Sequence, residues 1–250
     1  MSAILILSGA AGGLLIGMTG VGGGSLMTPL LVLGFGIAPA TAIGTDLIYA
    51  AVTKAGAVVC HHRQRHVEWR TAGWLLVGSL PGSLLTLWVL RSLPAGSAMD
   101  SWLRHGLALA LALTALALWL RKSRPVQPDA LARSVLWSPA LGFLIGILVT
   151  LSSVGGGALG TALLLVLYPE FSFSTVVGTE LAHAVPLTLI AGLGHLQLGH
   201  VDGSLLFSLL LGSLPGLWAG TRLHRLLPEK VARTFLSLLL LGLAVSLGRG

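Results

Sequence analysis

Residues 17–47 read GMTGVGGGSLMTPLLVLGFGIAPATAIGTDL, and residues 151–181 read LSSVGGGALGTALLLVLYPEFSFSTVVGTEL. Each stretch has a triple glycine early in an apolar run and a Gly-Thr pair followed by an acidic residue near its end. The two stretches are 133 to 134 residues apart in the chain. A repeat at a fixed separation indicates that the chain is a duplication of one structural unit.

Other short motifs recur at nearly the same separation. The matched pairs are Gly9 and Gly13 with Gly142 and Gly146, His61 with His195, His66-Val67-Glu68 with His200-Val201-Asp202, Ser79-Leu80-Pro81-Gly82 with Ser213-Leu214-Pro215-Gly216, and Pro94 with Pro228. We therefore divide the chain into a first repeat, 1–120, a basic linker, 121–133, and a second repeat, 134–250, which together form a single transmembrane domain.

The composition excludes an ordinary soluble protein. Of the 250 residues, 54% are hydrophobic and 9% are charged, against about 25% charged in a typical soluble domain. No Asp, Glu, Lys, Arg or His occurs in 1–45 or in 134–169, so neither stretch has a polar face for water. The chain is predicted to be an all-α, multi-pass membrane protein whose first apolar run stays in the mature protein.

Each repeat divides into five apolar segments. The predicted segments are 3–20, 24–35, 40–60, 71–91 and 103–120 in the first repeat, and 135–152, 157–168, 174–194, 203–222 and 232–248 in the second. The second segment of each repeat has about a dozen residues, which cover about 18 Å as a helix against a hydrocarbon core of about 30 Å. This segment is therefore predicted to be either re-entrant or a thinly spanning half-helix.

The basic residues predict the topology. If the first two segments of each repeat return the chain to its starting side, eleven Lys and Arg lie on one side and three on the other. If the first two segments instead cross the membrane only once, seven Lys and Arg lie on each side, and this even distribution violates the positive-inside rule. The eleven are Arg63, Arg65, Arg70, Arg121, Lys122, Arg124, Arg133, Arg222, Arg225, Lys230 and Arg233, and the three are Arg91, Arg104 and Arg249. We expect inverted repeats, a cytoplasmic linker and both termini on the outer side of the membrane.

Inverted repeats with broken helices are typical of secondary transporters, which bind substrate near the midplane. The triple glycines are the predicted breaks. They allow left-handed backbone and leave N–H groups free at the positive end of the following helix, as an anion site requires. The predicted substrate-binding residues are Gly22, Gly23, Gly24, Ser25, Thr45, Gly155, Gly156, Gly157 and Thr179. The alternative is that the glycines only allow a tight turn and close packing.

The stretch 17–47, followed by a basic loop and a Ser-Leu-Pro-Gly helix, resembles the sulfite exporter TauE/SafE family, and the second half repeats the pattern. The resemblance covers nearly the whole chain. It implies a bacterial inner-membrane permease for small sulfur-containing anions such as sulfite or organosulfonates. The position after Gly-Thr is commonly a small neutral residue in that pattern, whereas this chain has Asp46 and Glu180.

Acidic residues within apolar helices cost about 2.5 to 3.5 kcal/mol on insertion scales and normally face a polar interior. Asp46 and Glu180 are the predicted proton-coupling residues, with His183 one turn after Glu180 as a relay. A structural hydrogen bond or ion pair is the alternative. Lys54 lies about 12 Å along the helix from Asp46. We predict that Lys54 either attracts the anion or extends to the cytoplasmic surface, and surface extension is favoured.

Three other functions remain open. A passive anion channel is the main rival of a coupled carrier. The spacing of His62 and His66 allows a transition-metal transporter, although basic loops have a topological explanation and no metal site is predicted. Asp46 and Glu180 as an acid dyad allow an intramembrane hydrolase, but no nucleophile motif accompanies them, so the chain is predicted not to be an enzyme. We expect no cofactor and no nucleic-acid partner, and a monomer or homodimer in the lipid bilayer, with protons and a small anion as ligands.

Overall fold

The computed structural model describes residues 2–19, 24–93, 96–120, 130–154, 156–223 and 229–249, and the regular structure of these residues is entirely helical. The elements in chain order are α1 (Ser2–Thr19), α2 (Gly24–Pro29) with a π-helical continuation η1 (Leu30–Gly34), α3 (Pro39–Arg63), α4 (Trp69–Ser92), α5 (Ser97–Leu120), α6 (Ala130–Ser152), α7 (Ala158–Leu167), α8 (Phe173–Gln197), α9 (Gly203–Leu223) and α10 (Glu229–Arg249).

The helices lie where the apolar segments predict them, including the short second segment of each half. In the described residues, four helical stretches are long and apolar enough to cross a membrane: Pro39–Arg63, Trp69–Ser92, Phe173–Gln197 and Gly203–Gly220. The start of α6 differs from the prediction, because the helix begins at Ala130, inside the predicted linker 121–133. The rest of that linker, 121–129, lies outside the described residues.

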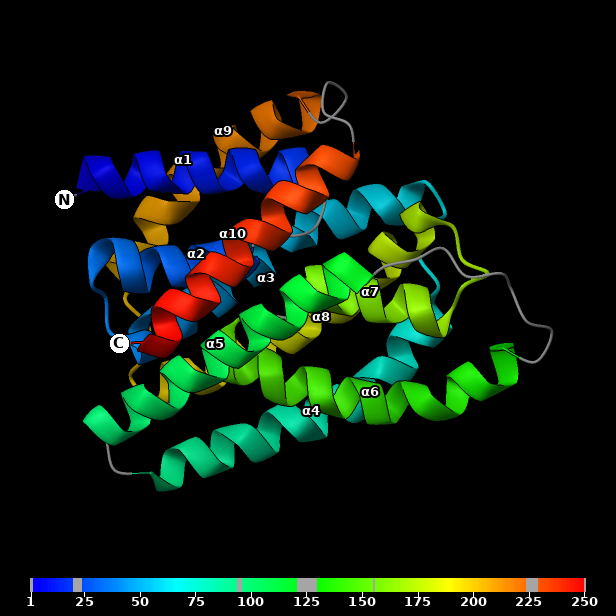
Figure 1. Ribbon diagram of the computed structural model, residues 1–250, viewed down its shortest axis with the longest axis horizontal. Coiled ribbons are helices and arrows are strands. Elements are labelled where there is room, and N and C mark those ends of the chain that lie inside the picture. Colours follow the sequence, from blue (N-terminus) through cyan, green and yellow to red (C-terminus); the bar gives the residue numbers. More distant parts are fainter. Residues whose placement is uncertain are drawn as a thin grey trace.

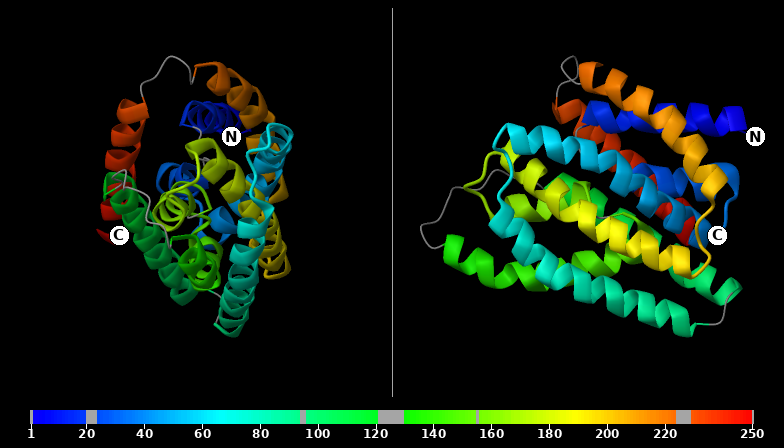
Figure 2. Two further views of the ribbon diagram at one scale, coloured as in Figure 1. Left: turned by 90° about the vertical axis from the view of Figure 1, so that its right-hand side faces the viewer. Right: turned by 180° about the vertical axis from the view of Figure 1, so that it is seen from behind.

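The two halves are packed together, and four long helices of the first half have their main partners in the second. Helix α1 packs against α9, α4 against α6, α3 against α8 and α5 against α10. Figure 1 and Figure 2 show these pairs side by side in more than one view. The helices are therefore not arranged as two separate bundles.

Glycines set the closest of these approaches. A Cβ on Gly9 of α1 would lie 2.6 Å from the carbonyl oxygen of Leu209 in α9, closer than real contacts allow. Gly142 of α6 stands in the same relation to the carbonyl of Leu75 in α4. Small residues at such crossings let helix backbones approach closely inside a membrane. The same kind of contact involves Gly13, Gly78, Gly82, Gly146, Gly212 and Gly216.

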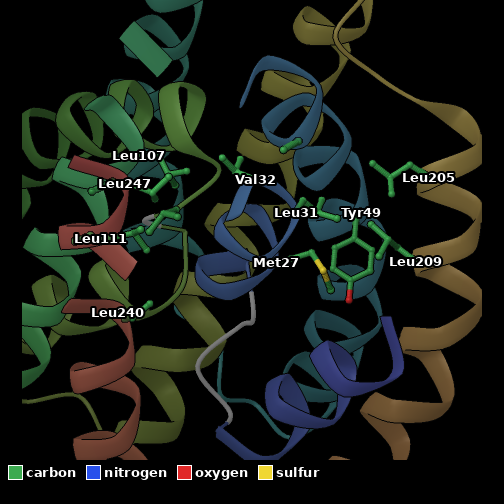
Figure 3. Close-up of a cluster of buried hydrophobic side chains, with 14 of the residues drawn as sticks. Met27, Leu31, Val32, Tyr49, Leu107, Leu111, Leu205, Leu209, Leu240 and Leu247 are labelled. Carbon is green, nitrogen blue, oxygen red and sulfur yellow. The ribbon is translucent and has the colours of Figure 1, made fainter. Parts of the chain in front are cut away.

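The short helix α2 lies inside the bundle. Met27 of α2 and Leu31 of its continuation η1 are almost fully buried. They belong to a hydrophobic cluster with Tyr49 of α3 and with leucines of α5, α9 and α10 (Figure 3). The cluster draws side chains from both halves, so the halves share one core.

The chain ends and the hairpin turns divide between two ends of the molecule. The first residues of α1 and the last of α10 lie at one end, together with the α8–α9 turn (Figure 1). The α3–α4 turn lies at the opposite end (Figure 2). Each turn contains a residue in the left-handed conformation, Arg65 (φ 58°) and Gly199 (φ 77°), which stand at equivalent positions of the two repeats.

Candidate functional site

Helices α3 and α8 carry both intramembrane acidic residues and pack against each other. Gly44 of α3 lies against the Cβ of His195 in α8, and Gly178 of α8 lies against the Cβ of His61 in α3. The two helices are therefore antiparallel, with their small residues at the crossing points. Asp46 is fully buried and Glu180 is 2% exposed, so both face the protein interior, as predicted.

Asp46 is held by the short helix α2. The hydroxyl of Thr28 donates a hydrogen bond of 2.5 Å to Asp46 Oδ2. The second oxygen, Oδ1, is buried with no hydrogen-bond partner. The Oγ of Ser153 is also buried and also has no hydrogen-bond partner. Ser153 lies close enough to the Asp46 carboxyl to interact with it electrostatically. The carboxyl thus touches α2 on one side and faces the break after α6 on the other.

Lys54 is inside the protein. Its side chain is 5% exposed, and its ammonium donates a hydrogen bond to the carbonyl oxygen of Gly156. The preferred expectation that Lys54 extends to the cytoplasmic surface is therefore wrong. The physical reason is that the turn after α6 provides a backbone carbonyl within reach of the ammonium in the interior.

Glu180 and His183 do not form the predicted pair. His183 is 1% exposed, and its Nε2 shares a hydrogen bond of 2.9 Å with the hydroxyl of Ser79 in α4. Glu180 Oε1 is buried without a hydrogen-bond partner. Among the described residues, the hydrogen-bond partner of His183 is thus Ser79 of the neighbouring helix α4. Glu180, which is one turn away in the same helix as His183, is not its partner.

The equivalent pair of residues, again one from each half, is a tyrosine and a serine. Tyr49 stands at the position of α3 that matches His183, and Ser213 of α9 matches Ser79. The buried Tyr49 hydroxyl faces Ser213, without a hydrogen bond of standard geometry. Sequence reasoning missed both serines, although the repeated Ser-Leu-Pro-Gly motif contained the signal.

The two carboxyls are far apart. Because Gly178 packs against His61, Glu180 lies about thirteen helical residues beyond Asp46 along the α3–α8 pair, a separation of about 20 Å. Lys54 lies between them and interacts electrostatically with both carboxyls. An acid dyad needs its carboxyls in contact, so the dyad that kept the hydrolase alternative open is not formed.

The triple glycines are described only in part. Gly22, Gly23 and Gly155 lie outside the described residues. Gly24 is the first residue of α2, and the side chain of Ser25 also lies outside the described part. Gly156 and Gly157 are buried in the turn between α6 and α7. A Cβ on Gly156 would lie 3.3 Å from the Lys54 ammonium, which brings this glycine motif and the buried cation together.

The left-handed backbone predicted for the glycines falls on a different residue. In the second break, Ser153 has φ 57°, whereas Gly157 has φ 174° and lies outside the left-handed region. The reversal of the chain therefore begins directly after α6 and not within the described glycines. Local strain at a non-glycine residue of this kind is frequently found at functional sites.

Thr45 and Thr179 hold the hairpin turns. The hydroxyl of Thr45 accepts a hydrogen bond of 3.0 Å from the backbone N–H of Asp202, and the hydroxyl of Thr179 accepts one of 3.0 Å from the N–H of Glu68. Asp202 in turn accepts hydrogen bonds from Leu205 and Ser204 at the start of α9, which lower its carboxyl pKa. The structure thus gives both threonines a part in fixing the helix ends.

In the histidine-rich turn, His62 and His66 contact different residues. His62 accepts a hydrogen bond of 3.3 Å from the indole of Trp69, whereas the ring of His66 lies beside that of His61, with 6.0 Å between ring centres. Within the described ranges, no three His, Cys, Asp or Glu side chains are grouped as metal ligands.

Comparisons with known proteins agree on a family. The model of the sulfite exporter TauE/SafE family matches residues 5–247. The probable membrane transporter protein YjnA of Bacillus subtilis is 36% identical over 231 residues, which cover 89% of this chain and 90% of that protein. YdhB, another probable membrane transporter protein of B. subtilis, is 27% identical, with coverages of 89% and 90%. A probable membrane transporter protein of Xylella fastidiosa is also 27% identical, with coverages of 88% and 84%.

No solved structure matches the chain. The family match extends over nearly all of the described helices and both halves of the duplication. The chain therefore belongs to the sulfite exporter TauE/SafE family and is a membrane transporter, not an enzyme.

Proposed function

We propose that this transporter is a secondary carrier that couples protons to the movement of a small sulfur-containing anion, such as sulfite or an organosulfonate. The observation that carries the proposal is the pair of buried carboxyls, Asp46 and Glu180, at equivalent positions of α3 and α8. The family match supports the substrate class. A buried ionisable residue in a membrane interior is a functional candidate because burial is costly.

The paired contacts between the halves support an inverted-repeat carrier. The approach of Gly9 to Leu209 has its equivalent in that of Gly142 to Leu75, and the bond from Asp202 to Thr45 has its equivalent in that from Glu68 to Thr179. Two halves with equivalent contacts allow two equivalent conformations, one open to each side of the membrane. With the basic turns in the cytoplasm, both termini are periplasmic and the protein resides in the inner membrane.

Proton coupling follows from the charges. A bare anion moving through a low-dielectric interior has a large desolvation cost. A carboxyl that binds a proton together with the substrate cancels this added charge. Asp46 and Glu180 carry that role in the proposal, one from each half.

The burial of the site supports an alternating mechanism. Asp46, Glu180 and Lys54 are each at most 5% exposed. A substrate therefore reaches them only after the helices move, as an alternating carrier requires. In the proposal the substrate binds beside Gly156 and Gly157, between α3, α8 and the start of α7.

The test uses purified protein in liposomes with an imposed pH difference. A coupled carrier accumulates radiolabelled sulfite or methanesulfonate above its outside concentration, and a protonophore abolishes the accumulation. A passive channel lets the anion equilibrate but never concentrates it under a pH gradient alone. Equilibration without accumulation would replace the carrier with the channel, and the absence of any flux for both anions would reject the substrate class.

A further inference from the structure

Lys54 is unusual because it is a buried cation that occurs in one half only. Among the side chains that the structure describes, it is the one buried Lys or Arg. Residue 188 of α8 stands at the equivalent position and is a threonine, whose hydroxyl bonds the carbonyl of Ala184 in its own helix at 2.8 Å. The charge is therefore an addition to a duplicated framework and is not required by the helix packing that both halves share.

The surroundings of Lys54 satisfy it only partly. An ammonium group has three N–H donors, and the described chain gives it the Gly156 carbonyl as a direct acceptor. Asp46 and Glu180 interact with it electrostatically from opposite directions along the helix pair. His183, which also lies within electrostatic range of the ammonium, adds no negative charge. An isolated buried charge is costly unless it is paired.

We propose that the Lys54 ammonium is the direct ligand of the substrate's oxyanion group, which binds between Lys54 and the Gly156–Gly157 turn. This inference rests on the proposed function and names the residue that recognises the anion. The single lysine sets one anion per chain, although the framework is duplicated. The Gly156 carbonyl accepts one hydrogen bond of the ammonium and orients it, so that its other donors serve the substrate oxygens.

The glycine turn lies directly against the Lys54 ammonium. The place that a Cβ of residue 156 would take lies 3.3 Å from the Lys54 ammonium, 3.5 Å from the Cβ of Ala184 and 3.7 Å from a methyl group of Val149. A single added carbon is already crowded there, so in the proposal the oxyanion binds beside this turn only after the helices have moved. A charge-assisted hydrogen bond from the ammonium is about twice as strong as a neutral one and selects anions over neutral molecules of the same shape.

The charge balance gives a measurable consequence. With both carboxylates ionised, the three groups Asp46, Glu180 and Lys54 sum to one negative charge. Binding of a monovalent anion adds a second, so a carboxylate takes up a proton when the anion binds. Anion binding by the purified protein is therefore accompanied by proton uptake from a weakly buffered solution.

The experiment measures binding of radiolabelled sulfite and methanesulfonate to the purified full chain in detergent. Lys54→Met, which nearly keeps the length of the side chain but removes the charge, lowers the affinity at least about tenfold, and Lys54→Arg retains part of it. Arg70→Gln removes an exposed charge of α4 and serves as the matched control with unchanged binding. Equal affinity of Lys54→Met and the wild type would overturn the proposal.

Two further measurements test the proposal even if the Lys54→Met variant does not fold. The double variant Lys54→Thr with Thr188→Lys moves the ammonium to the equivalent position, and it restores anion binding relative to Lys54→Thr alone. In the wild type, the neutral molecule dimethyl sulfone does not compete with methanesulfonate, although the two have nearly the same shape. Equal competition by the sulfone would overturn the role of the cation.

The failure of this inference differs from the failure of the proposed function. If the wild type binds sulfite and Lys54→Met binds it with the same affinity, the anion is recognised by other groups and the carrier proposal stands. If the wild type binds neither sulfite nor methanesulfonate, while acetate or phosphate binding still depends on Lys54, the substrate class is wrong and the lysine's role stands. If no anion depends on Lys54, its role is rejected.

Discussion

Single residues in the interior of this protein combine polar chemistry with almost complete burial. Asp46 has one oxygen bonded to Thr28 and the other without a hydrogen-bond partner. Glu180 likewise has a buried oxygen without one. Buried carboxyls are normally fully hydrogen-bonded, and exceptions require an explanation. A group that binds and releases a proton during transport provides one.

The first prediction concerns Glu180. Glu180→Gln keeps the shape of the side chain but cannot titrate, so the variant should exchange labelled for unlabelled anion across the liposome membrane while losing accumulation driven by a pH difference. Counterflow and gradient-driven uptake measured on the same liposomes separate the two activities. If the variant still concentrates substrate when only a pH difference is applied, Glu180 is a structural residue.

The second prediction concerns Thr28. A hydrogen bond contributes about 0.5 to 1.5 kcal/mol, or about 1.5 to 3 kcal/mol when its acceptor is charged, so Thr28→Val should lower the free energy of unfolding by about 0.5 to 3 kcal/mol. The matched control is Thr114→Val, which removes a buried hydroxyl that bonds its own helix at the carbonyl of Ala110. Unfolding in mixed detergent and SDS micelles measures both. An equal loss in Thr28→Val and Thr114→Val would mean that the Asp46 contact adds nothing.

At the scale of the helices, stability depends on close crossings made by glycines of α1, α4, α6 and α9. Gly78 of α4 lies against the backbone carbonyl of Pro139 in α6, whereas a Cβ on Gly73 of the same helix would meet open space. Gly78→Ala should destabilise the fold by about 1 to 3 kcal/mol through overpacking. Gly73→Ala should be neutral or stabilising by up to about 1 kcal/mol. Thermal unfolding of the two variants gives opposite shifts, and a shared destabilisation would contradict this packing.

The glycine motifs before α2 and α7 have a functional prediction of their own. Gly156→Val places a branched side chain beside the Lys54 ammonium, so transport should be abolished while the purified protein remains monodisperse. Gly23→Val tests the equivalent motif, although Gly23 lies outside the described residues. Full transport activity in either variant would mean that the substituted glycine has only a packing role.

The helical elements can be predicted from the sequence because apolar runs and glycine repeats are local signals. Tertiary contacts of polar residues are harder to predict. The spacing of Glu180 and His183 indicates a shared proton, but His183 bonds Ser79 from another helix. The favoured surface position of Lys54 is wrong because the turn at Gly156 accepts its hydrogen bond inside. Neither partner is near in sequence, so periodicity carries no information about which group reaches the site.

At the scale of the whole molecule, the two halves form one unit. The hydrophobic cluster around α2 includes residues of α1, α3 and α5 from the first half and of α9 and α10 from the second (Figure 3). Neither half can bury its apolar faces alone in this arrangement. In the proposed carrier, motion between two conformations therefore requires helices of both halves to move together.

The arrangement of the turns leads to a prediction of membrane orientation. The α3–α4 turn with His66 and the α8–α9 turn with His200 lie at opposite ends of the molecule (Figure 1, Figure 2). Because of the basic residues around the first turn, we expect it to lie in the cytoplasm, and the second turn is then expected to be periplasmic. In a Cys60→Ser background, a single cysteine at position 200 should react with a membrane-impermeant maleimide on intact cells.

A cysteine at position 66 should react with the same reagent only after the membrane is opened. His66 is partly exposed and His200 is 9% exposed, so a cysteine at the exposed neighbour Arg65 and one at Gly203 provide matched positions with better access. Labelling of both turns from the same side would mean that the pairs α3–α4 and α8–α9 enter the membrane in the same direction. The halves would then be related by a parallel repeat, and the equivalence of the two conformations, on which the carrier mechanism depends, would be lost.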